Sequence, residues 1–285
     1  MSALKYAPPT CRQTVSRKTK PDAKTWTFAA VVVIVVATAV AATATARPTP
    51  MVRLPEGDFM PFFQESPGKG KARVAVVPIR MAAFRLDAVP VTNAQFLDFV
   101  RGHPEWRRSR IKPLFADHHY LAKWQSDLKL PDAGAVSEPV TNVSWFAAEA
   151  YCEAQGLRLP TTEQWEYALA DQGRKQTEIT LQSLDWFSSP NPRHLSAVGH
   201  SEPNGYGVRD LVGLVWEWTL DYSSFMTGTE QRNTSSKDDA AFCGSGSIGV
   251  NDATDYPAFM RYALRSSLKA NYTVENVGFR CEGDE

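Results

Sequence analysis

The chain has 285 residues, with 31 basic and 31 acidic side chains, enough for one large domain or two small ones. Its 43% hydrophobic and 22% charged residues exclude a disordered or fibrous chain. Four cysteines are too few for a disulfide-dense small domain, and no close CxxC pair indicates structural zinc. Residues 1–46 hold six basic groups and one acidic group, a net charge of +5, so the remainder of this neutral chain has −5. A basic start before an acidic body does not indicate a nucleic-acid-binding protein.

Residues 26–46 contain no charged side chain. As a helix they would be about 31 Å long, which matches the roughly 30 Å hydrocarbon core of a bilayer. Three lysines come shortly before them, so the positive-inside rule places the basic residues 1–25 in the cytoplasm. We therefore expect one transmembrane anchor and a main domain outside the cytoplasm, periplasmic or extracellular. The alternative is a signal peptide cleaved after the A-x-A-like motif that ends at Ala46, which would make the protein secreted.

The body of the chain follows a short spacer at residues 47–50. No linker interrupts residues 51–285, which are predicted to form one domain. Short apolar runs broken by Gly, Pro and Asn predict an irregular α+β fold in which eight tryptophans help to fill the core. Short strands are expected near residues 73–84 and 216–220.

Three helices of the body have clear N-terminal signals. Thr92 and Thr161 each begin a capping-box pattern, in which a glutamine follows three residues later. Ser144 is the expected N-cap of a helix over residues 145–155 that ends at Gly156.

Five segments of the body carry recognisable motifs in a fixed order. They are residues 51–59 (MVRLPEGDF), 84–100 (FRLDAVPVTNAQFLDFV), 139–170 (PVTNVSWFAAEAYCEAQGLRLPTTEQWEYALA), 204–219 (NGYGVRDLVGLVWEWT) and 276–281 (NVGFRC). Together they resemble the formylglycine-generating enzyme, or sulfatase-modifying factor, family. The resemblance implies that family's fold, a variant of the C-type-lectin fold with little regular secondary structure, here preceded by one transmembrane helix.

In the oxidising members of that family, two cysteines before the final arginine-containing strand hold copper(I) and convert a substrate cysteine to formylglycine with oxygen. The corresponding positions fall near Asp252 and Pro257, and no cysteine lies between Gly244 and Arg280. A carboxylate and a proline do not replace two thiolates as copper(I) ligands. We therefore expect neither copper nor the standard formylglycine reaction.

Cys243 is the thiol nearest to that region. One interpretation makes Cys243 a ligand of a changed metal or redox site, with Asp252 as a second candidate catalytic residue. The other makes it an unpaired cysteine that packs as a small hydrophobic residue.

The resemblance also implies a structural disulfide between Cys152 and Cys281. The alternative is two buried free thiols, which an exported location disfavours.

A calcium site is implied at the 204–219 motif. Its ligands would be side-chain oxygens of Asp210 and Glu217 and the backbone carbonyls of Gly213 and Val215, a set of oxygens that suits calcium. In the alternative interpretation, Glu217 pairs with a nearby arginine beneath two tryptophans.

A binding pocket in a divergent member would be formed by polar and aromatic residues, namely Trp216, Asp252, Tyr256, Phe259 and Arg261. Three arginines either bind an acidic ligand at the edge of this pocket or anchor carboxylates in the core; these are Arg261, Arg265 and Arg280. His118 and His119 are interpreted as a surface pair, because no further histidine lies at a ligand spacing.

Three functions remain open. The first is an exported, membrane-anchored accessory or maturation factor that binds a protein partner. The second is an oxygen-dependent oxidase that modifies a protein side chain through a changed metal site involving Cys243. The third, ranked last, is a carbohydrate-binding module that uses the calcium ion.

Overall fold

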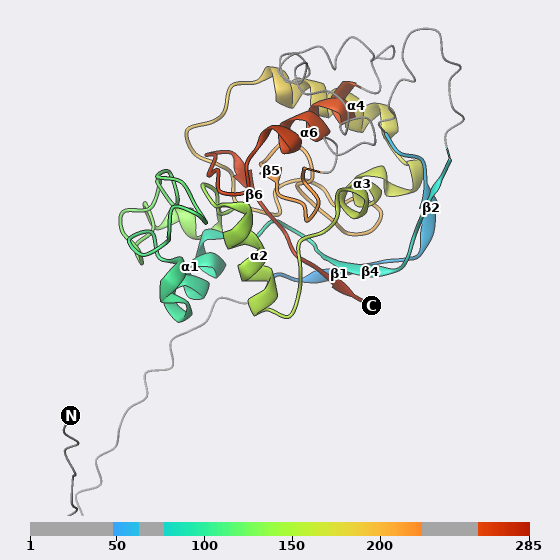
Figure 1. Cartoon of the computed structure of the whole chain (residues 1–285). Helices are drawn as coiled ribbons and strands as arrows, with labels where there is room; N and C mark the ends of the chain where they lie inside the picture. Colours follow the sequence, from blue (N-terminus) through green and yellow to red (C-terminus); the bar gives the residue numbers. More distant parts are fainter. Residues whose placement is uncertain (1–47, 63–76, 224–255) are drawn as a thin grey trace, which may run out of the picture. The chain divides into compact units, whose positions relative to one another are not determined.

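A computed structural model describes residues 48–62, 77–223 and 256–285 (Figure 1). All of them belong to one compact unit, residues 44–285. The expected anchor at residues 26–46 lies outside the described residues, as do Cys243 and Asp252. Within the described ranges, no helix is both long enough and apolar enough to cross a membrane.

A three-stranded antiparallel sheet joins the two ends of the domain. Its strands, in spatial order, are β1 (Met51–Leu54), β4 (Phe84–Asp87) and β7 (Glu282–Asp284). Along β4, Phe84 and Leu86 are buried and Arg85 is exposed, the alternation expected of a strand with one face on the core. Figure 1 shows β1 and β4 side by side, with the C-terminal segment passing next to them.

Two smaller sheets complete the strand structure of the described residues. They are β2 (Gly57–Phe59) paired antiparallel with β3 (Ile79–Met81), and β5 (Trp216–Glu217) paired parallel with β6 (Val277–Gly278). Both expected strand regions therefore contain strands, although β5 is shorter than residues 216–220. At Gly278, an added Cβ would lie 2.7 Å from the Val140 carbonyl oxygen, so β6 can pack here only with glycine.

All three helices with cap signals are present. They are α1 (Asn93–Gly102), α2 (Trp145–Ala154) and α3 (Thr162–Ala170). Thr92 and Thr161 each form a complete capping box, and the Ser144 side chain accepts a hydrogen bond from the Ala147 N–H. Helix α2 ends just before Gly156, which has a φ of 71°, the left-handed conformation that favours glycine after a helix.

Two further helices lack such signals in our sequence analysis. They are α4 (Gln176–Ser188) and α6 (Tyr256–Ser267). Lys175, which precedes α4, has a left-handed backbone conformation, and its side chain does not cap the helix. All thirteen residues of α4 are described, and only Ser183 among them is buried. Short 3-10 turns lie at Pro104–Trp106, Gly134–Ser137 and Asp171–Gly173.

Among the described residues, most of the buried hydrophobic side chains form two clusters. One surrounds α1 and α2 and includes Phe96, Tyr151 and Phe279; the other lies between β4 and α3. The predicted disulfide between Cys152 and Cys281 is confirmed, with Cα atoms 5.6 Å apart. It links α2 to the chain segment between β6 and β7.

The stability of the fold is expected to depend on pH through Asp87, the buried residue at the end of β4. Its carboxylate accepts a hydrogen bond from the Cys281 N–H at 2.9 Å, and burial raises its pKa to about 7 from 3.8. Between these two values the folded state binds more protons than the unfolded state, so the free energy of unfolding falls as the pH rises through this window.

The variant Asp87→Asn should remove this dependence, because an amide stays neutral and its oxygen can still accept the Cys281 N–H. Urea unfolding of both proteins at about pH 5 and about pH 8 measures the difference. We expect the variant to gain stability relative to the wild type at the higher pH. An equal difference at both pH values would contradict the raised pKa.

Candidate functional site

A buried ion pair joins Glu217 of β5 to Arg280, two residues after the end of β6. The Arg280 guanidinium donates through Nε to Glu217 Oε2 at 2.7 Å and through Nη2 to Oε1 at 2.8 Å. The Trp165 Nε1–H donates to the same Oε2 at 2.7 Å. Nη1 and Nη2 of Arg280 also donate to the carbonyls of Asp87 and Arg209, each at 3.0 Å. Since both charged side chains are fully buried, these contacts replace the water that they lose.

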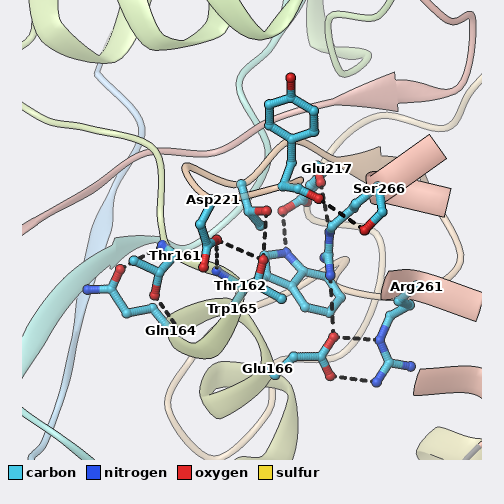
Figure 2. Close-up of polar contacts among 12 residues, drawn as sticks. Thr161, Thr162, Gln164, Trp165, Glu166, Glu217, Asp221, Arg261 and Ser266 are labelled. Atoms are coloured by element: carbon cyan, nitrogen blue, oxygen red, sulfur yellow. Dashed lines mark hydrogen bonds and ion pairs between the residues drawn. The ribbon is translucent and has the colours of Figure 1, made fainter. Parts of the chain in front are cut away.

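A second buried charge cluster joins α3 to α6 (Figure 2). Arg261 donates to both oxygens of Glu166, at 2.8 and 2.6 Å, and Arg265 Nη1 lies 3.4 Å from Glu166 Oε1. Arg265 Nε donates to the Glu217 carbonyl at 3.2 Å, and its guanidinium lies 4.5 Å from the centre of the Trp165 ring. Burial lowers the pKa of Arg265.

These contacts decide the role of the three arginines in favour of the core interpretation. Arg261, Arg265 and Arg280 all bind buried carboxylates or carbonyls and none faces open solvent. Our sequence analysis missed Glu166 as a partner. The available signal was its place on α3, one turn from Thr162 and Leu169, which are both buried.

The calcium interpretation involves two carboxylates that lie in different surroundings. Asp210 accepts hydrogen bonds from the N–H groups of Gly199 and, at 2.9 Å, Ser201. Glu217 is occupied by Arg280 and Trp165, as in the ion-pair alternative. A calcium ion held by both carboxylates would have to displace the Arg280 guanidinium from Glu217. The contacts therefore favour the alternative interpretation, in which Glu217 pairs with an arginine. Calcium binding at this loop stays a prediction, including its use of the Gly213 and Val215 carbonyls.

The expected pocket residues have different environments. Trp216 stacks on two aromatic rings of α4, with ring centres 4.9 Å from Phe187 and 4.7 Å from Trp186. On α6, Tyr256 is 39% exposed, whereas Phe259 is buried. Arg261 binds Glu166, and Asp252 lies outside the described residues. The structure therefore places Trp216 against α4 rather than in an open groove.

Pro257 lies near one of the two positions where the family resemblance in the sequence implied a copper-binding cysteine. It is buried in the first turn of α6. There it borders a small enclosed space shared with Phe62, Ile179 and Arg261. The residue at this position thus belongs to the packing between α4 and α6.

A cleft of about 850 Å³ lies between α4 and the segment that carries Asp210. One side is formed by the start of α4 and the residues before it, including Arg174, Glu178 and Gln182. The other side is formed by residues 201–205 and by Asp210, Leu211 and Val212. The volume is within the range of ligand sites, and the lining contains both signs of charge beside apolar side chains.

The chain is similar to known proteins over most of its length. The Sulfatase-modifying factor enzyme 1-like domain matches residues 36–284. The formylglycine-generating enzyme of Streptomyces coelicolor is 29% identical over 286 residues, covering 82% of this chain and 88% of that protein. The inactive C-alpha-formylglycine-generating enzyme 2 of Mus musculus is 30% identical over 289 residues, covering 81% and 84%.

Among solved structures, PvdO from Pseudomonas aeruginosa is 16% identical with a TM-score of 0.44, covering 82% of this chain and 94% of that one. The family resemblance expected from the five sequence motifs is confirmed by the domain match and by the curated relatives, which include both active and inactive proteins. The chain therefore belongs to the sulfatase-modifying factor family, the family of the formylglycine-generating enzymes.

Proposed function

We propose that this protein is an exported, membrane-anchored member of the family that binds a protein partner and assists its maturation without formylglycine chemistry. One observation carries the proposal: the described residues keep the core contacts of the domain, while the copper-binding thiols that the family resemblance implies are missing from the sequence. These core contacts include the Cys152–Cys281 disulfide, which the resemblance implies, and the buried Arg280–Glu217 pair. The sequence has no cysteine between Gly244 and Arg280, and Pro257 is packed inside the fold.

The cleft between α4 and the Asp210 segment is the described surface that we propose for the partner. Arg174 and Lys175 at one end offer positive charge, and Glu178 and Glu202 offer negative charge. Apolar side chains, among them Leu211, also line the cleft. This mixture suits a peptide segment with both charged and apolar residues better than a purely apolar small molecule.

The absence of formylglycine chemistry is tested with a cysteine peptide, oxygen and the full chain supplied with copper(I). We expect no more conversion than in a reaction without protein, as measured by mass spectrometry of the peptide. The same assay with Cys243→Ser is the control. Conversion by the wild type that is lost in this variant would replace our proposal with the oxidase alternative.

Partner binding is tested with a photoreactive residue at Gln182, which is exposed on α4 and lines the cleft. The matched control is the same photoreactive residue at Glu153, which is exposed on α2. In cells, we expect an exported protein to be cross-linked at Gln182 and not at Glu153. Equal labelling at both positions would contradict the assignment of the partner to this cleft.

A further inference from the structure

A cluster of three possible metal ligands lies in the turn before Tyr120, away from α4. Asp117, His118 and His119 each offer one ligand atom, and these atoms all lie within 4.8 Å of one another. The two imidazole rings have their centres 3.8 Å apart. Both histidines are exposed, as the surface-pair interpretation predicted.

The Asp117 carboxylate is fixed in place by two backbone N–H groups and by the Thr273 hydroxyl, which donates to Oδ1. Its Oδ1 accepts the His119 N–H at 3.0 Å, and its Oδ2 accepts the Thr273 N–H at 3.3 Å. The gap from Oδ1 to His119 Nδ1 is 3.9 Å, too long for a hydrogen bond. Two ligands of one tetrahedral zinc ion are about 3.4 Å apart, so a small movement of the exposed His119 ring brings both atoms within reach of the same ion.

Asn142 provides a second, independent observation. Its side chain is 5% exposed, and Nδ2 donates to the Thr273 carbonyl at 3.2 Å. This contact fixes the orientation of the amide, because a carbonyl accepts only from the nitrogen. The Oδ1 atom is buried and has no hydrogen-bond partner among the described residues. Leaving a buried acceptor unpaired in this way is unfavourable, so a water molecule is expected to pair with it where one can reach it.

Asn142 shares one cleft with two of the three residues of the cluster. Asp117, His119 and Asn142 all line a space of about 510 Å³, which Thr273 also borders. Lys123 lies on the same cleft, but its Nζ is bound to the Glu275 carbonyl at 3.2 Å. Asn142, whose Oδ1 is unpaired, therefore borders the same water-accessible space as one carboxylate and one imidazole of the cluster.

We propose that Asp117, His118 and His119 bind one divalent transition-metal ion of the zinc class. In this proposal Asn142 Oδ1 accepts a hydrogen bond from a water molecule on the ion. Two imidazoles and one carboxylate form a ligand set that suits Zn²⁺, and three protein ligands leave a position for water. The site shares no residue with the cleft proposed for the partner, so it extends the proposed function and does not depend on it.

Zinc binding is measured on the full chain, purified in mild detergent, freed of metal with a chelator and titrated with Zn²⁺. All proteins carry Cys243→Ser, so that this thiol does not contribute. We expect the variant His118→Ala/His119→Ala to bind one equivalent of zinc less than the parent protein, with an unchanged melting temperature, because both side chains are exposed. The matched control His194→Ala removes another exposed histidine and should bind like the parent.

Equal stoichiometry and affinity in the double variant and the parent would overturn the proposal. The role of Asn142 is tested by Asn142→Gly, since glycine retains the left-handed backbone of this residue, whose φ is 54°. Loss of the water contact should weaken zinc binding by about tenfold while the stoichiometry stays the same. Unchanged affinity would overturn the part assigned to Asn142.

Discussion

Removal of the disulfide by Cys152→Ala is expected to lower the free energy of unfolding by about 2–5 kcal/mol. The bridge closes a loop with a sequence separation of 129, which corresponds to about 4–5 kcal/mol in the chain-entropy model. Both cysteines are fully buried, so the variant also loses packing around the missing sulfur. Denaturant unfolding monitored by tryptophan fluorescence gives the value.

The double variant Cys152→Ala/Cys281→Ala separates a disulfide from two independently packed thiols. If the bond forms, either single variant removes it, and the double variant should lose little more than a single one. If the thiols packed independently, the two single losses would add. Additive losses would therefore contradict the disulfide.

The variant Glu217→Gln is also expected to lower the free energy of unfolding strongly, by about 3–5 kcal/mol. The substitution leaves the buried Arg280 guanidinium without its counter-charge, although the amide can still accept one of its hydrogen bonds. Thermal and urea unfolding would report the loss. The double variant Glu217→Gln/Arg280→Met should recover part of it, because the uncompensated charge is then removed.

The matched control is the exposed pair of Arg53 and Glu285, whose side chains are 56% and 55% exposed. Solvent screens such a pair, so Glu285→Gln should cost at most about 1 kcal/mol. If Glu217→Gln destabilised the protein no more than Glu285→Gln does, the buried pair would not stabilise the fold as we argue.

The sequence predicts those elements whose signals are local. Thr92, Ser144 and Thr161 identify three helix starts because the caps are contacts within four residues. Helix α4 has no such cap, and its largely exposed residues give no clear apolar face. Helix α6 begins at Tyr256, directly after a range that the structure does not describe. Its Pro257 was an available signal, since proline favours the first turn of a helix.

The site was harder to predict than the helices because its contacts are distant in sequence. Arg261 and Glu166 are 95 residues apart, and Arg280 and Glu217 are 63 apart. Composition and periodicity do not predict contacts between residues so far apart in sequence. From the sequence alone, the arginines could therefore bind a ligand or pair with carboxylates in the core. The cysteine pairing came from the family resemblance alone. Asn142 gave no signal, because an unpaired buried oxygen is visible only in three dimensions.

The order of strands in the β1–β4–β7 sheet has a consequence for biosynthesis. β4 lies in the middle of this sheet, yet β7 is the last of the described strands to be made. Next to the β4–β7 pairing, Arg280 donates a hydrogen bond to the Asp87 carbonyl, and these two residues are 193 apart in sequence. One edge of β4 therefore stays unpaired until nearly the whole domain has been synthesised. An unpaired strand edge can pair with other chains. A prematurely terminated product without β7 is thus an aggregation-prone fragment and not a smaller working domain.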